Sequence, residues 1–160
     1  MNLNFPLLKY VRDNFKDKIH ISLGMTTAQE RDQIFDFMNG YPTVYYWCTS
    51  SYPCRFEDVN LLNLKELFCK FKDVGYSSHS QGIAVEIAAV IFGASYIEKH
   101  FTLSRDMKGN DHSASLEFEG LKKLVRDIEH VSKTFTHRTK ILPSEMESYK
   151  KMKKVIPLEN

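Results

Sequence analysis

An alternation of short apolar strands with amphipathic helices constrains the fold of this 160-residue chain. Runs rich in β-branched and aromatic residues begin near residues 18, 43, 73 and 95, and a helical pattern follows each run. Strands that run parallel need a long crossover connection, which a helix supplies, whereas antiparallel strands need only a tight turn. The chain is therefore predicted to be an α/β protein of four consecutive βα units with a parallel sheet and right-handed crossovers.

The spacing of apolar residues sets the expected boundaries. An opening helix carries Phe5, Leu8, Val11 and Phe15 at helical intervals. The expected strands are 18–22, 43–48, 73–77 and 96–103, and the expected helices are about 27–39, 57–71, 83–92 and 116–135. Residues 1–137 are predicted to form the domain, and residues 138–160 a polar linker that leaves it.

The composition is that of one globular domain, with 42% hydrophobic and 26% charged residues. The net charge of +2 does not favour nucleic acid, and no apolar run approaches the ~20 residues that span a bilayer. The N-terminus lacks a secretion-signal pattern. Cys48, Cys54 and Cys69 are an odd number without CxxC spacing, which argues against a disulfide framework or a structural zinc site. We expect a cytoplasmic protein without nucleic-acid or membrane partners.

Polar residues follow the carboxyl end of every expected strand. Ser22 ends the first, Ser50 and Tyr52 follow the second, Ser77 ends the third, and the loop 105–112 follows the fourth. Parallel α/β proteins place their sites at this edge, because the strand ends and βα loops converge there. The serines have an alternative role as helix caps. A nucleotide is disfavoured, since the chain has neither a G-x-G-x-x-G segment nor a P-loop.

Two histidines lie at the ends of sequential strands. His79 and His100 would be brought together if those strands are neighbours, because paired strands lie about 4.8 Å apart. Alternation also places Glu98 on the His100 side of its strand. Two neutral imidazoles suit a first-row ion such as Mn²⁺ or Zn²⁺, with other positions open for water and substrate. Alternatively, each is a hydrogen-bonded histidine near a loop, and both interpretations stay open here.

Five segments in a fixed order carry a resemblance to a known family. They are Cys48–Pro53 (CTSSYP), Glu57–Leu61 (EDVNL), Gly75–His79 (GYSSH), Ile97–Leu103 (IEKHFTL) and Lys108–Glu117 (KGNDHSASLE). Together they closely resemble the sialic acid synthases, which comprise N-acetylneuraminate synthases and their 9-phosphate, legionaminate and pseudaminate relatives. The resemblance extends from the first expected strand to Leu142–Met146 and so covers nearly the whole chain.

The resemblance implies a (β/α)₈ TIM barrel that condenses phosphoenolpyruvate with N-acetylmannosamine or its 6-phosphate. The products would be N-acetylneuraminate or its 9-phosphate, together with phosphate. It also implies a divalent metal, Mn²⁺ or Mg²⁺. By motif match, the metal ligands are His79 and His100, and the phosphoenolpyruvate contacts are Ser22 and Ser77. Ser50 is expected to bind substrate at the position where some members have Asn beside phosphoenolpyruvate. Tyr52 lines both substrates, Asp111 binds the sugar hydroxyls, and both of these residues count as catalytic.

This sequence departs from the family pattern at Leu23, Trp47 and Ser78, where threonine, histidine and aspartate are usual. The resemblance matches strands five to eight of the barrel, without the half that supplies the phosphoenolpyruvate-binding lysines and without the antifreeze-like domain. A complementary N-terminal half-barrel, separately encoded or part of a longer parent chain, or self-association is therefore expected. A noncatalytic metal- or sugar-binding remnant and a purely structural fragment are the alternatives.

Overall fold

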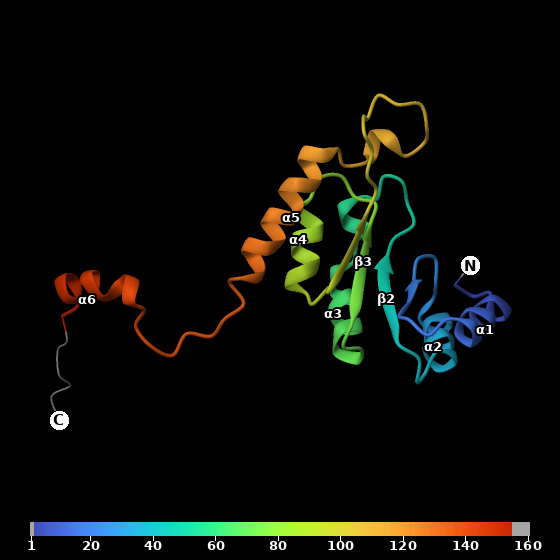
Figure 1. The fold of residues 1–160 in the computed structure, drawn as a ribbon, viewed down its shortest axis with the longest axis horizontal. Helices are drawn as coiled ribbons and strands as arrows, with labels where there is room; N and C mark the ends of the chain where they lie inside the picture. Colours follow the sequence, from blue (N-terminus) through green and yellow to red (C-terminus); the bar gives the residue numbers. More distant parts are fainter. Residues whose placement is uncertain (1, 155–160) are drawn as a thin grey trace.

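Four parallel strands form one sheet in the computed structural model, which describes residues 2–154 (Figure 1). The strands lie side by side in chain order and are β1 (Ile19–Ser22), β2 (Thr43–Cys48), β3 (Val74–Ser78) and β4 (Tyr96–Lys99). Their register pairs Ser22 with Tyr46, Cys48 with Ser77, and Ser77 with Glu98. The predicted parallel α/β sheet is confirmed.

The helices follow the strands in turn. They are α1 (Phe5–Asn14) before the sheet, then α2 (Ala28–Phe37), α3 (Leu61–Lys70), α4 (Ala84–Ile91) and α5 (Phe118–Ser132), with short 3₁₀ turns η1 (Phe56–Asp58) and η2 (His112–Ala114) in the loops. A capping box begins α2, in which Thr27 Oγ1 accepts from the Glu30 amide and the Glu30 carboxylate accepts from the Thr27 amide.

The hydrophobic core lies between the sheet and the helices. In β1, Ile19 and Ile21 are buried while His20 and Ser22 are exposed, as expected for a strand covered on one face only. The buried side chains of the helices and strands form one cluster that includes Ile34, Met38, Leu64, Leu67, Val74, Tyr76 and Ala89. The other face of the sheet, called here the open face, carries polar groups that include His20, Ser22, Ser77 and Glu98.

The fourth strand is shorter than the sequence predicts. It ends at Lys99 rather than near residue 103, because β3 ends at Ser78 and supplies no further pairing. The chain beyond Lys99 pairs instead with Leu116, whose amide donates to the His100 carbonyl and whose carbonyl accepts from the Thr102 amide. This bridge closes the loop 103–115, and α5 begins two residues later.

The C-terminal segment contains the 3₁₀ turn η3 (Pro143–Glu145) and α6 (Met146–Met152), a helix that the sequence analysis does not include. Figure 1 shows α6 lying away from the sheet and its helices. The division into a domain at 1–137 and a linker at 138–160 stays a prediction, and its last six residues lie outside the described part. Within residues 2–154, no helix is long and apolar enough to cross a membrane.

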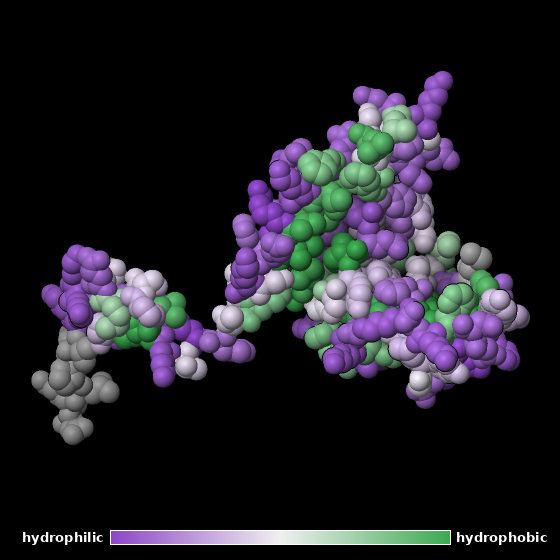
Figure 2. Space-filling view, viewed as in Figure 1, coloured by the Kyte–Doolittle hydropathy of each residue, from purple (hydrophilic) through white to green (hydrophobic). Residues whose placement is uncertain are grey.

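One face of α5 presents apolar side chains to the surface. Phe118, Leu121 and Val125 are exposed at helical spacing, while Leu124 is buried. Figure 2 shows hydrophobic side chains gathered over α5 and the adjacent α4. We call Phe118, Leu121 and Val125 the α5 stripe; it has the pattern of a helix face that packs against another element.

Candidate active site

A cavity of about 110 Å³ lies at the carboxyl ends of β3 and β4. Four of the predicted site residues line it, namely Tyr52, His79, His100 and Asp111. Pockets for small organic ligands usually measure about 300–1,000 Å³. The cavity therefore has room for an ion and water.

The two histidine rings lie against each other. Their centroids are 5.3 Å apart with planes at 81°, and the ring of Tyr52 lies 4.1 Å from that of His79 and 5.8 Å from that of His100. The Nδ1 atom of His79 is 2.8 Å from the Thr49 carbonyl oxygen, which can only accept, so Nδ1 donates. The neutral ring therefore has its lone pair on Nε2. Metal-binding histidines are commonly oriented by this kind of backbone contact.

The residues present fit a divalent ion with only two protein ligands. Within the part of the chain that the structure describes, no three His, Cys, Asp or Glu side chains form a group that could hold a metal. His79 and His100 would leave the other coordination positions to water and substrate. Catalytic metal sites keep such open positions, whereas structural sites are closed by protein ligands. The ligand role of the two histidines stays a prediction.

A second group of polar side chains surrounds Gly24. A Cβ atom at this position would lie 2.4 Å from Ser50 Oγ, 3.2 Å from Cys48 Sγ and 3.5 Å from Ser22 Oγ. Glycine thus allows Ser22 and Ser50, two predicted substrate contacts, to approach the same point. Cys48, which the sequence analysis does not assign to the site, links the two groups, since its sulfur is 3.8 Å from both Ser50 Oγ and His79 Nδ1.

Ser77 and Glu98 form a hydrogen-bonded pair on the open face. Ser77 Oγ donates to Glu98 Oε1 at 2.6 Å, across the register pair of β3 and β4. The alternation of β4 predicts the side of the strand on which Glu98 lies but assigns it no role. The structure adds that Glu98 holds the hydroxyl of a predicted substrate contact.

The environment of Tyr52 keeps its phenol protonated. Partial desolvation raises the pKa of Tyr52 above its ordinary 10.0, and the nearby Cys48, Asp111 and Glu98 add to this effect because their negative forms repel a phenolate. A neutral phenol can donate a hydrogen bond to a substrate oxygen at neutral pH.

The loop that carries Asp111 is fixed by its own hydrogen bonds. Ser115 Oγ donates to the Asp111 carbonyl at 2.7 Å, and Arg105 Nε donates to the Ser115 carbonyl at 2.9 Å. Thr102 Oγ1 lies 2.7 Å from His112 Nδ1. These bonds place the exposed Asp111 side chain at the rim of the histidine cavity.

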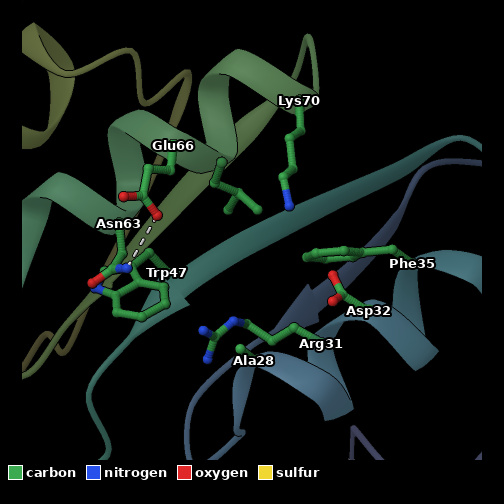
Figure 3. Close-up of a pocket in the computed structure, with 9 residues that line it drawn as sticks. Ala28, Arg31, Asp32, Phe35, Trp47, Asn63, Glu66 and Lys70 are labelled. Atoms are coloured by element: carbon green, nitrogen blue, oxygen red, sulfur yellow. Dashed lines mark hydrogen bonds between the residues drawn. The ribbon is translucent and has the colours of Figure 1, made fainter.

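A groove between α2 and α3, shown in Figure 3, lies on the helix-covered face of β2, opposite to the open face of the sheet. Charged side chains of both signs surround it, and Trp47 forms part of it while donating from Nε1 to the Val59 carbonyl at 2.8 Å. It contains none of the predicted site residues. Trp47 and the core residue Leu23 therefore depart from the family pattern at positions whose side chains do not line the histidine cavity.

The fold and the site together define an α/β protein of the (β/α)-barrel type, whose polar groups converge at the carboxyl ends of parallel strands. The model of the NeuB family matches residues 1–140, and the chain belongs to this family. It is 38% identical to the N-acetylneuraminate-9-phosphate synthase of Homo sapiens, over 96% of this chain and 44% of the relative. It is 41% identical to the N,N'-diacetyllegionaminic acid synthase of Campylobacter jejuni, over 81% of this chain and 40% of the relative.

The solved structures agree with the fold. A crystal structure of N-acetylneuraminic acid (sialic acid) synthetase from Leptospira borgpetersenii, in complex with citrate, superposes with a TM-score of 0.82 at 32% identity, and the match covers 94% of this chain and 54% of that one. The predicted family and the half-barrel architecture are confirmed. The chain spans about half the length of the relatives that it matches.

Proposed function

We propose that this chain supplies half of the catalytic barrel of a nonulosonate synthase. The reaction would join phosphoenolpyruvate to N-acetylmannosamine or its 6-phosphate, giving N-acetylneuraminate or its 9-phosphate and phosphate. The observation that carries the proposal is the convergence of Tyr52, His79, His100 and Asp111 on one cavity, in a chain of the NeuB family.

The metal would be held by His79 and His100. Imidazole nitrogens favour Mn²⁺ over Mg²⁺, which prefers oxygen ligands and retains its waters. When bound, such an ion would polarise the carbonyl oxygen of the sugar aldehyde. The bond from Nδ1 of His79 to the Thr49 carbonyl supports this role, because it leaves Nε2 available.

The remaining residues would bind and orient the two substrates. Ser22 and Ser50 would donate to the oxygens of phosphoenolpyruvate, and Ser77 would do so only by exchanging its hydrogen bond to Glu98 for one to the substrate. Asp111 would accept from sugar hydroxyls, and the neutral Tyr52 phenol would donate between the two substrates. In the reaction, carbon 3 of phosphoenolpyruvate forms a bond to the aldehyde carbon, water adds at carbon 2, and phosphate leaves with cleavage of its C–O bond. Alignment of the two substrates is the main contribution of such contacts.

The proposed function requires the other half of the barrel, from a separate chain or from a longer parent chain. The chain matches 44% of the human relative and 54% of the Leptospira structure, so a complementary half-barrel would have to supply the rest of the substrate contacts. Developing negative charge on a phosphoryl substrate needs several aimed donors. We propose such a half, or a second copy of this chain, as the partner. A cytoplasmic location stays a prediction.

The test mixes the chain with the N-terminal half of a NeuB-family relative and measures phosphate release from phosphoenolpyruvate plus N-acetylmannosamine or its 6-phosphate. Release is expected in the mixture and not with either half alone. His79→Ala and His100→Ala should each lower the rate at least tenfold and weaken the Mn²⁺ heat in calorimetry of the chain. His130→Ala on the exposed side of α5 is the matched control. Folded halves that associate without releasing phosphate would contradict the synthase proposal. Unchanged Mn²⁺ heats in both variants would remove the ligand pair and leave a structural fragment.

A further inference from the structure

A buried ion pair lies at the wall of the histidine cavity, which Lys99 lines. Lys99 Nζ is 2.6 Å from Glu86 Oε1, and the two side chains are 4% and 0% exposed. The other ion pairs of the described residues lie at or near the surface. Burying two charges costs solvation free energy that the pair regains only with good geometry, so a buried pair is weak evidence for a role in stability alone.

The ammonium of Lys99 has contacts on both sides of His79. It donates to Ser78 Oγ at 3.2 Å and also to the Ser80 carbonyl. Ser78 and Ser80 flank His79 in the chain, and Lys99 itself directly precedes His100. The Lys99 side chain therefore links the two residues that flank His79 to the residue that precedes His100.

The backbone does not supply this connection beyond the end of the sheet. The last register pair between β3 and β4 is Ser78 with Lys99. Past it, the His79 carbonyl accepts from the Cys54 amide, whereas the His100 carbonyl accepts from the Leu116 amide, each at 2.9 Å. The two segments thus turn to different partners at the level of the two rings. Lys99 holds them together there, and Glu86 on α4 holds Lys99.

We propose that Lys99 and Glu86 are positioning residues that set the separation of the His79 and His100 rings. This inference rests on the proposed function in that it takes these rings as the metal ligands. Lys99 belongs to the lining of the histidine cavity, but its ammonium is bound to Glu86, Ser78 and the Ser80 carbonyl and its side chain is only 4% exposed, so we take it to act on the neighbours of the rings. Residues that orient metal ligands typically change metal affinity about 10–100-fold when they are replaced.

The variant that tests the proposal removes both charges at once. Removal of Lys99 or Glu86 alone would leave one buried charge without a partner and destabilise the whole chain. Glu86→Leu combined with Lys99→Met keeps similar side-chain volumes and leaves no lone charge. The matched control is Lys18→Met combined with Asp73→Asn, which removes the partly exposed ion pair between residues just before β1 and β3.

The first measurement uses the metal-free full chain, with labelled histidines, in nuclear Overhauser spectroscopy alongside thermal melting. The parent and the control should show cross-peaks between the His79 and His100 rings, and the Glu86→Leu/Lys99→Met variant should lose them while it still melts cooperatively. Mn²⁺ titration should then show affinity reduced about 10–100-fold in that variant alone. Cross-peaks and Mn²⁺ affinity that are unchanged in the folded variant would overturn the proposal, as would a parent without ring cross-peaks.

Two further outcomes keep the test decisive. If the double variant does not fold, Ser78→Ala replaces it, since this change deletes one Lys99 contact and no charge; weakened ring cross-peaks support the proposal and unchanged ones overturn it. The parent could show the ring cross-peaks and the variant lose them while the parent binds no Mn²⁺. This outcome would contradict the metal site of the proposed function and support the positioning role.

Discussion

At the scale of single residues, the core of this protein contains two phenols whose ionisation opposes folding. Tyr45 on β2 and Tyr76 on β3 are 3% and 2% exposed and belong to the hydrophobic cluster between sheet and helices. Burial raises the pKa of each to about 12, because a phenolate would lose its hydration there. The folded state therefore holds two protons that the unfolded state releases near pH 10.

This difference predicts a loss of stability at alkaline pH. Between pH 10 and 12 the unfolded chain binds fewer protons than the folded chain, so the free energy of unfolding falls as the pH rises. At about 1.4 kcal/mol for each unit of pKa difference, each tyrosine would account for about 2–3 kcal/mol by pH 12. Urea unfolding measured from pH 8 to pH 12 should show a shallower decline in Tyr45→Phe and Tyr76→Phe than in the parent. Tyr10→Phe, at an exposed position, should follow the parent; equal slopes in all four proteins would contradict the assignment.

At the scale of elements, the N-terminus of α2 connects helix capping to the candidate site. The cap at Thr27 lies three residues after Gly24, in the short loop that joins β1 to α2, and Thr26 Oγ1 donates to the Leu23 carbonyl at 2.6 Å. The same loop gathers Ser22 and Ser50 around Gly24. A frayed first turn of α2 would therefore loosen the loop that holds the predicted substrate contacts.

Thr27→Ala should reduce the free energy of unfolding by about 1 kcal/mol, the usual cost of removing a hydroxyl cap. The pH dependence comes from Glu30, whose pKa is lowered below its ordinary 4.5 because the carboxylate accepts from the Thr27 amide and hydroxyl. Its contribution is present above pH 4.5 and is lost as the pH falls through the lowered folded-state pKa. Chemical unfolding at pH 7 and pH 3 should thus show that Glu30→Gln destabilises more at the higher pH. Gln29→Ala serves as a control on the same turn; an equal effect of Glu30→Gln at both pH values would count against the capping box.

Local patterns in the sequence are sufficient for most of these elements but not for the contacts between them. The β-branched run Thr43–Cys48 and the Thr27/Glu30 cap predict β2 and α2 close to their observed ends. The predicted end of β4 was wrong, because the chain past Lys99 pairs with Leu116, which comes back to it only after a long loop. Lys99 itself has no local signal: its charge lies between Glu98 and His100, and its burial depends on how α4 places Glu86. The convergence of His79 and His100 was predicted because neighbouring parallel strands bring their ends together.

At the scale of the whole molecule, the chain presents surfaces that a complete barrel would cover. β1 and β4 are the two edges of the sheet, and an edge strand offers unpaired backbone groups to another chain. The open face carries Ser22, Ser77 and Glu98, and the α5 stripe exposes Phe118, Leu121 and Val125. These surfaces support the proposal that the chain associates with a complementary half-barrel or with itself. Since α5 follows the edge strand β4, its stripe lies where a neighbouring strand and helix would pack.

Leu121→Asp combined with Val125→Asp should therefore weaken association without unfolding the chain. Both side chains are exposed, at 36% and 51%, so the change removes little from the core, whereas a buried contact with a partner would have to desolvate two carboxylates. Sedimentation velocity of the chain, alone and mixed with an N-terminal half from a NeuB-family relative, should show the dissociation constant rising at least tenfold.

Lys122→Asp combined with Arg126→Asp adds the same two carboxylates to exposed charged positions of α5 and should have a smaller effect at matched salt. If both double variants associate as tightly as the parent, the α5 stripe is not part of the interface and the sheet edges alone would have to form it. A parent that stays monomeric at all concentrations and does not bind the added half would remove association between separate chains from the proposed function.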